Sequence, residues 1–153
     1  MKEFIRPLSL SLLLLSLAGC SLLPPADTFP TSTPVPSIPP SGYEPQPGDE
    51  QLKRGNVFLE LGNSSLAIME SFPVQVNAML NGNLPDPCHQ LRVIVKPADT
   101  NNQVHLEVYS LADSSKVCIT VLQPFNATIA LGSFPSGHYR VYVNDELLGE
   151  FDA

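Results

Sequence analysis

The sequence predicts an all-β fold, a single antiparallel β-sandwich of about seven to nine short strands. Three observations carry this prediction. Apolar and polar residues alternate with a period of two in successive segments from Gly55 onward. Turn-forming residues separate these segments roughly every eight to twelve positions, and no segment has a helical period. The expected strands cover residues 57–61, 66–68, 74–80, 91–96, 104–108, 117–122, 126–131, 138–143 and 147–151.

The clearest of these strands have one apolar face and end in turn residues. In residues 74–80 every second side chain is aliphatic, and Asn81-Gly82 supplies turn chemistry directly after the run. Near the C-terminus, residues 138–143 alternate in the same way, and Asn144-Asp145 predicts a hairpin turn into residues 147–151.

The first 20 residues have the order of an export signal. Lys2 and Arg6 precede a short apolar run over residues 8–17, which ends in Leu17-Ala18-Gly19-Cys20. This run is shorter than the about 20 residues that cross a bilayer. The junction resembles the lipobox of bacterial lipoproteins. The resemblance implies that residues 1–19 are a lipoprotein signal peptide, and that Cys20 becomes an acylated N-terminus held on a membrane.

Residues 20–50 predict a disordered linker that carries the lipidated cysteine. Residues 21–50 hold nine of the 16 prolines of the chain, together with many serines and threonines. Proline removes backbone donors, and so few apolar side chains cannot offset the entropy lost on ordering. We expect a spacer with polyproline II character that lifts a domain from the membrane.

Residues 51–153 are expected to form one domain. Its two cysteines, Cys88 and Cys118, predict a disulfide, because an even pair in an exported chain is usually oxidised. The alternative is a metal or thiol site that includes His89, but the spacing of the cysteines is far from that of a zinc site.

The segment Pro135-Ser-Gly-His-Tyr-Arg-Val-Tyr-Val-Asn resembles the closing hairpin of immunoglobulin-like and fibronectin-III-like modules. The resemblance implies that Gly137 makes the turn and that Tyr139 packs inside an immunoglobulin-like sandwich. The resemblance is clear over the last twenty residues, whereas the rest of the domain shares only the regular spacing of short strands and turns. The chain has no tryptophan, so the Cys-Trp-Cys pattern of antibody domains is absent.

The sequence contains no recognisable catalytic motif, and we expect no enzyme activity, no cofactor and no resident metal. The three histidines are scattered. His105 and His138 fall on expected outward faces, where they could meet Glu107 at a fortuitous metal site if their strands were neighbours. Surface histidines with no such role are the more common case.

Two surfaces are candidates for binding. The loop over residues 83–89 holds two prolines and ends at the expected disulfide, and we expect it to present Leu84, Asp86 and His89. The alternative is that this loop only turns the chain and seats the disulfide. Tyr109 and Tyr142 both point outward by alternation, and they form the second candidate surface.

The net charge of the chain restricts the classes of partner that it could bind. Removal of residues 1–19 takes away Lys2, Arg6 and Glu3, which leaves six basic and 14 acidic residues and a net charge of −8. This negative net charge argues against binding to nucleic acid and against electrostatic docking on anionic lipid. We expect an extracytoplasmic lipoprotein, held on the cell membrane or outer membrane through Cys20, that displays a binding module for a protein or glycan. The alternatives are a structural envelope lipoprotein without a ligand and, less favoured, a small hydrolase.

Overall fold

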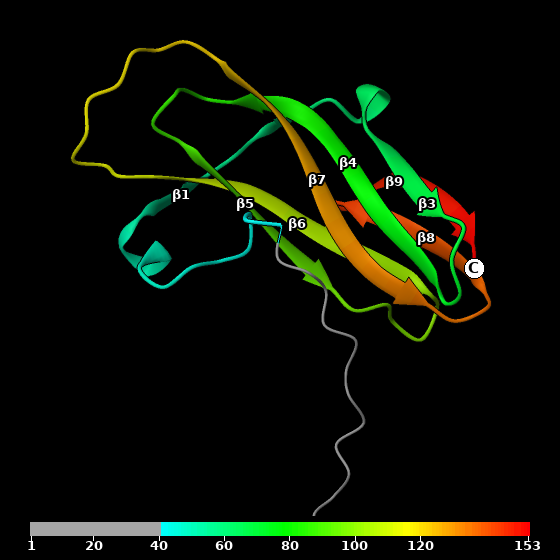
Figure 1. Cartoon of the computed structure of the whole chain (residues 1–153). Coiled ribbons are helices and arrows are strands. Elements are labelled where there is room, and N and C mark those ends of the chain that lie inside the picture. The colour runs from blue at the N-terminus through cyan, green and yellow to red at the C-terminus, as the bar shows by residue number, and fades with distance from the viewer. Residues whose placement is uncertain (1–40) are drawn as a thin grey trace, which may run out of the picture. The chain divides into compact units, whose positions relative to one another are not determined.

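The computed structural model describes residues 41–153 as a sandwich of two β-sheets (Figure 1). Two short 3-10 turns, η1 (Asp49–Gln51) and η2 (Leu61–Asn63), lie before the third strand. Sheet A has five strands: β1 (Lys53–Gly55), β5 (Gln90–Lys96), β6 (Gln103–Ala112), β8 (His138–Val143) and β9 (Glu146–Asp152). Sheet B has four strands: β2 (Phe58–Leu59), β3 (Ser65–Met69), β4 (Val74–Leu84) and β7 (Gln123–Phe134).

The all-β sandwich predicted from the alternation is therefore confirmed. The expected signal peptide, the lipobox with Cys20 and most of the expected linker lie outside the described residues. Within residues 41–153, no helix is long and apolar enough to span a membrane.

The core lies between the two sheets and is built from the alternating aliphatic residues. In β4, the side chains of Val76, Ala78 and Leu80 are fully buried. In β6, Val104 and Leu106 are buried on the opposing sheet. Burial of each valine or leucine side chain contributes about 1.5–3 kcal/mol, so the period-two pattern decides which face of each sheet turns inward.

An aromatic cluster closes the core where the chain passes from β7 to β8. The rings of Phe134, Tyr139 and Phe151 pack with centroids 5.0–5.2 Å apart. The hydroxyl of Tyr139 donates to the carbonyl of Pro135 at 3.1 Å. The expected burial of Tyr139 is confirmed. The expected hairpin at Gly137 is wrong, because β7 and β8 belong to different sheets and residues 135–137 connect them.

Strand β6 is the centre of sheet A, and one of its pairings departs from the expected antiparallel arrangement. On one side β6 pairs with β5 along its length, and on the other it pairs with both β1 and β8. The β6–β8 pair is parallel. After β6 the chain crosses to sheet B, runs back along β7 and returns, so β8 takes the same direction as β6.

The segment 117–122, expected as a strand, is part of an irregular loop between β6 and β7. Cys118, near the start of this segment, is bonded to Cys88 in the β4–β5 turn, and no residue of the segment pairs with a strand. The alternating aliphatic residues are consequently exposed, Val117 completely and Ile119 by 71%. A period of two identifies an extended segment but does not say that a neighbouring strand exists to bury it.

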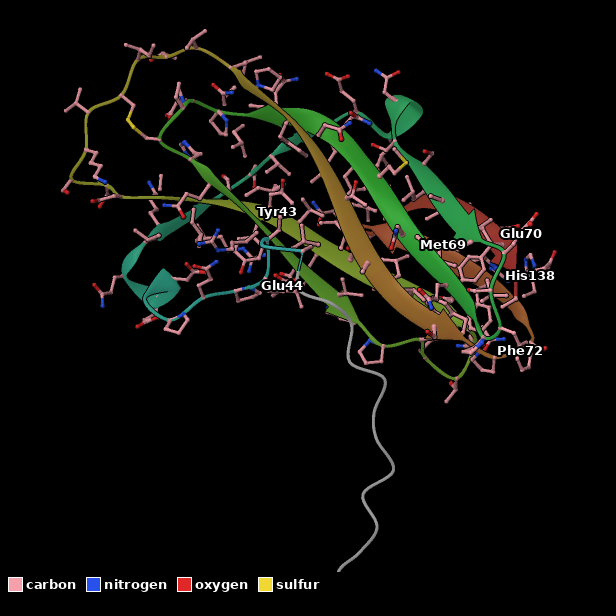
Figure 2. The ribbon with its side chains drawn as sticks, viewed as in Figure 1. Tyr43, Glu44, Met69, Glu70, Phe72 and His138 are labelled. Carbon is pink, nitrogen blue, oxygen red and sulfur yellow. A yellow bond between two sulfur atoms is a disulfide. The ribbon has the colours of Figure 1, made fainter. Side chains whose placement is uncertain are left out.

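The described chain begins before the expected domain boundary at residue 51. The carbonyl of Tyr43 accepts a hydrogen bond from the backbone amide of Val93 at 2.7 Å, along the outer edge of β5. The ring of Tyr43 packs against the core, in the position labelled in Figure 2. Disorder is therefore the wrong expectation for residues 41–50, because Tyr43 and Asp49 bring enough contacts to order this stretch.

Asp49 makes the strongest polar contact of this N-terminal stretch. The guanidinium of Arg92, only 8% exposed, donates from Nε to Asp49 Oδ2 at 2.7 Å and from Nη2 to Oδ1 at 3.0 Å. Two parallel charge-assisted hydrogen bonds fix both side chains. The hydrogen bond from Arg92 lowers the pKa of Asp49 below its ordinary value.

Candidate functional site

A groove of about 760 Å³ lies on sheet A where β6 lacks a strand neighbour on one side. The β8 pairing ends at Leu106 and the β1 pairing begins at Ser110, so the backbone between them faces the groove instead of a strand. The lining comes from β1, the start of β2 and the connection between them, and from β5, β6 and the β8–β9 turn: Arg54, Gly55, Asn56, Val57, Phe58, Lys96, His105, Leu106, Glu107, Val108, Tyr109, Asn144 and Asp145.

Asn144 fills the gap beside β6 with its side chain. The backbone amide of Val108 donates to Asn144 Oδ1 at 2.8 Å, and Asn144 Nδ2 donates to the carbonyl of Val108, also at 2.8 Å. The backbone amide of Asn144 reaches the carbonyl of Leu106 at 2.9 Å. The amide side chain thus replaces the backbone of a missing strand, which keeps the floor of the groove extended and its polar groups satisfied.

The turn that carries Asn144 explains why this residue type stands there. Asn144 and Asp145 have φ angles of 47° and 70°, the left-handed pair of a two-residue hairpin. Asparagine tolerates this region better than other residues with a side chain. The sequence prediction of this hairpin turn is confirmed, but the contact of Asn144 with β6 needed the pairing of the sheets.

One wall of the groove is an arginine stacked on an aromatic ring. The guanidinium carbon of Arg54 lies 3.7 Å from the centroid of Tyr109, and the same guanidinium pairs with Glu107. Tyr109 was expected to be exposed, but it is only 8% exposed because Arg54 covers it. Half of the Arg54 side chain remains open to solvent, so the wall presents a cation held in place by a ring and a carboxylate.

The other end of the groove holds a second ring pair. His105 stacks on Tyr142 across the β6–β8 pair, with centroids 5.1 Å apart and planes within 13°. Lys96 lies opposite His105 on β5. Tyr109 and Tyr142 therefore share the outer face of sheet A, as expected, but they do not touch. Tyr142 stands beside the groove and does not line it.

The loop over residues 83–89 does not present the expected recognition surface. Leu84 closes β4 and is only 6% exposed, within the hydrophobic core. The prediction that Leu84 is an exposed anchor is wrong, because β4 extends to Leu84. The side chain of Leu84 therefore points to the same inward face as that of Leu80. The turn expected at Asn81-Gly82 is also wrong, because both residues lie inside β4.

Asp86 and His89 serve the turn itself. Asp86 Oδ1 accepts from the backbone amide of Cys88 at 2.8 Å and lies 2.9 Å from His89 Nδ1. The hydrogen bond with His89 lowers the pKa of Asp86 from its ordinary value. Both side chains are mostly buried, so the alternative that this loop turns the chain and seats the disulfide agrees with the geometry.

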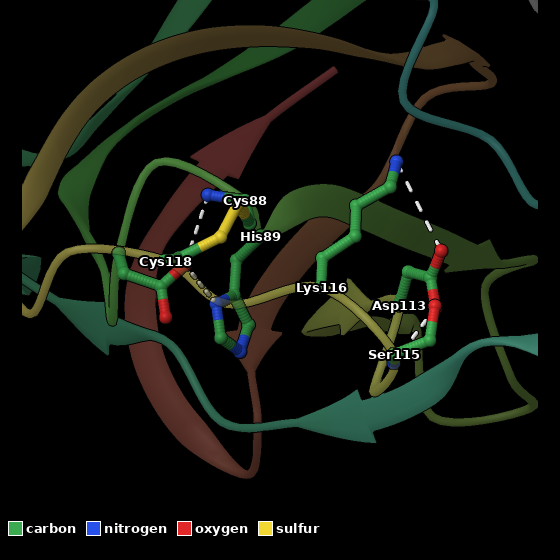
Figure 3. The surroundings of a disulfide bond; sticks show 7 residues. Cys88, His89, Asp113, Ser115, Lys116 and Cys118 are labelled. Atoms are coloured by element: carbon green, nitrogen blue, oxygen red, sulfur yellow. Dashed lines mark hydrogen bonds and ion pairs between the residues drawn. A yellow bond between two sulfur atoms is a disulfide. The ribbon is translucent and has the colours of Figure 1, made fainter.

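The disulfide between Cys88 and Cys118 is confirmed, with the two Cα atoms 6.2 Å apart (Figure 3). It joins the β4–β5 turn to the β6–β7 loop. Among residues 41–153, one cluster of potential metal-ligating atoms occurs: Asp86 and these two cysteines. Sulfur atoms bonded to each other do not offer the thiolates that a metal requires.

His105 and His138 have separate partners. His138 Nδ1 lies 2.8 Å from Asp152 Oδ1, and its Nε2 lies 3.5 Å from Glu150 Oε2. The hydrogen bond with Asp152 raises the pKa of His138 above its ordinary value. The strands of the two histidines, β6 and β8, are neighbours, but His105 lies opposite Tyr142 and not opposite His138. His138 lies at the start of β8 with the two carboxylates of β9.

The sequence analysis missed three residues that shape the groove: Arg54, Lys96 and Asn144. No local signal distinguishes Arg54 or Lys96, since their positions beside β6 follow from pairings between distant strands. For Asn144 a signal existed, because a hairpin asparagine with a left-handed backbone can point its amide at a neighbouring strand.

Comparison with known proteins gives two matches. Residues 78–153 match the model of the ORF11 beta-sandwich domain, from the middle of β4 to the C-terminus. An uncharacterized 10.2 kDa protein in the HgiCIIM 5′ region of Herpetosiphon aurantiacus is 29% identical over 82 residues, which cover 53% of this chain and 86% of that protein. No solved structure matches the chain.

Proposed function

We propose that the protein is an extracytoplasmic lipoprotein, anchored to the cell membrane or outer membrane through Cys20, whose sandwich is a non-catalytic binding module. The groove beside β6 is the observation that carries the binding role. It combines a half-exposed arginine on a ring, a lysine, a carboxylate and the exposed ring of Phe58. Arginine and aromatic residues dominate the energetics of protein interfaces.

A protein partner agrees best with this chemistry, and a glycan is the alternative. The groove residues already pair with one another, so their side chains are ordered before a partner arrives. Preordered side chains lose little entropy on binding.

The export and anchoring part of the proposal is supported by the Leu17-Ala18-Gly19-Cys20 junction and by the disulfide. Disulfides persist in oxidising compartments outside the cytoplasm. The likeness to immunoglobulin-like modules is strongest at Tyr139, whose hydroxyl bonds backwards to Pro135 as in a tyrosine corner. The parallel β6–β8 pair is a departure from that pattern.

Binding is tested with the full chain as bait in an envelope extract. Arg54→Ala uncovers Tyr109 and should reduce capture of the partner about thirtyfold, the effect of losing one interface anchor of about 2 kcal/mol. Arg140→Ala is the matched control, because Arg140 is similarly exposed and pairs with Glu150 away from the groove. Equal capture by both variants would argue against the groove.

The anchor is tested by metabolic labelling with palmitate. The wild-type chain and the control Ser16→Ala should be labelled and fractionate with membranes, whereas Cys20→Ala should lose both properties. A Cys20→Ala chain that remains labelled would refute acylation at this residue.

A further inference from the structure

Strand β7 is a free sheet edge within the described part of the chain. It pairs with β4 over its whole length, from Gln123 opposite Leu84 to Phe134 opposite Val74. On its other side, no strand or loop backbone of residues 41–153 bonds to it. The edge of β5 differs, because it receives the carbonyl of Tyr43. Unpaired backbone donors and acceptors along twelve residues form a template for another strand.

This edge carries no charged side chain, although a β-bulge at Leu131 interrupts its pairing with β4. From Val117 to Gly137 the sequence contains no lysine, arginine, histidine, aspartate or glutamate. One proline, Pro124, stands near the beginning of β7, and none follows within the strand. Natural edge strands are commonly blocked by charge, proline or a covering segment. The absence of charge here stands out on a chain as acidic as this one.

The loop that leads into β7 extends the same uncharged surface. Ile119, Val121 and Leu122 are all more than half exposed, and Leu122 directly precedes the strand. The Cys88–Cys118 disulfide holds the loop at one end of the sandwich, and the β3–β4 turn with exposed Phe72 lies at the other end (Figures 1 and 2). Pairing of backbone groups alone buries little apolar surface. The exposed aliphatic side chains beside this strand edge supply apolar surface that a partner strand could bury.

We propose that β7 pairs with β7 of a second copy of this chain, antiparallel and across a two-fold axis. Identical edges can pair in this way because each then offers the same groups to the other. The uncharged edge allows this occupant, because two acidic chains can meet here without bringing carboxylates together. Pairing joins two four-stranded sheets into one of eight strands.

A pairing centred on the middle of β7 would place the two Thr128 side chains opposite each other, because directly opposed residues of antiparallel strands share a face of the sheet. Thr128 is exposed on the outer face of sheet B, opposite Met79. The groove beside β6 belongs to sheet A, so the dimer leaves it open. The 18 residues from 117 to 134 are fewer than the about 20–30 a side of a standard interface, which predicts a weak dimer.

The experiment places a photo-cross-linking amino acid at Thr128 of the full chain in its membrane. We expect a covalent dimer whose cross-linked peptide comes from β7 of a second copy. The same probe at Gln75 is the matched control, because Gln75 is exposed on the same face of sheet B but in the central strand β4. It should give little dimer.

Charge substitutions sharpen the test without the probe. Thr128→Lys sets two like charges opposite each other and should reduce dimer captured by a bifunctional cross-linker several-fold. A mixture of Thr128→Lys and Thr128→Glu chains should restore it as a mixed dimer. Absence of any dimer in a chain with an intact disulfide would overturn the proposal, as would undiminished dimer in Thr128→Lys. Capture of a different protein alone at Thr128 would also overturn it.

Discussion

The contact of Asn144 with β6 gives the sharpest stability prediction. Its side chain makes two hydrogen bonds to the backbone of Val108, in the place where sheet A lacks a strand. Asn144→Ala removes both bonds and also puts alanine at a φ of 47°, a left-handed backbone that asparagine tolerates better. Asn144→Gly removes the same bonds without strain from the left-handed backbone.

The expected magnitudes follow from these two effects. Two hydrogen bonds of about 0.5–1.5 kcal/mol each give a loss of about 1–3 kcal/mol for Asn144→Gly. The left-handed conformation adds about 1 kcal/mol for alanine, so Asn144→Ala should lose about 2–4 kcal/mol. Asp145→Gly is the control, because Asp145 shares the positive φ and has no side-chain hydrogen bond within the described residues. It should be neutral or slightly stabilising.

The assay is urea unfolding of the full chain, with the free energy of unfolding obtained from the midpoint and slope for each variant. The slope should stay constant, since the surface exposed on unfolding does not change. If Asn144→Gly were as stable as the wild type, the amide would not be replacing a strand. If alanine and glycine were equally destabilising, the backbone conformation would carry no cost and the argument from φ would be wrong.

Three further outcomes can be measured in the same way. Cys118→Ser should lose about 3–4 kcal/mol, the entropy of a loop with a sequence separation of 30, and the difference from wild type should vanish in reductant. Leu84→Ala should lose about 2–5 kcal/mol, whereas an exposed loop residue would lose almost nothing. Arg92 lowers the pKa of Asp49, so the pair stabilises the fold above the ordinary pKa of 3.8, and this stabilisation is lost as pH falls through the lower folded pKa. In Asp49→Asn, the free energy of unfolding should therefore fall less steeply as the pH is lowered into the acid range. An unchanged dependence on acid pH would contradict this assignment.

Local pattern was sufficient for much of the fold. The inward faces of β4 and β6 follow from alternation alone, because a strand sends successive side chains to opposite sides and only one side meets the core. The disulfide followed from having two cysteines in the domain of a chain expected to be exported, and the β8–β9 turn from Asn144-Asp145. Each of these features depends on the chemistry of single residues or on residues that are close together in the sequence.

The same reasoning failed wherever a distant segment decided the outcome. Leu84 is buried because β7 pairs with β4 to its end, and Tyr109 is covered because β1 brings Arg54 over it. The exposed aliphatic loop that contains Ile119 has the period of a strand but no neighbour to bury it.

The sequence by itself thus determined the class of fold, the inward faces and the covalent link between Cys88 and Cys118. Tertiary structure alone decided the groove beside β6 and the free edge of β7. Both are gaps in strand pairing, and a gap is defined by which distant strands do not meet. Hydrogen bonds between strands join residues far apart in the chain, so the places left without them have no local signature in the sequence.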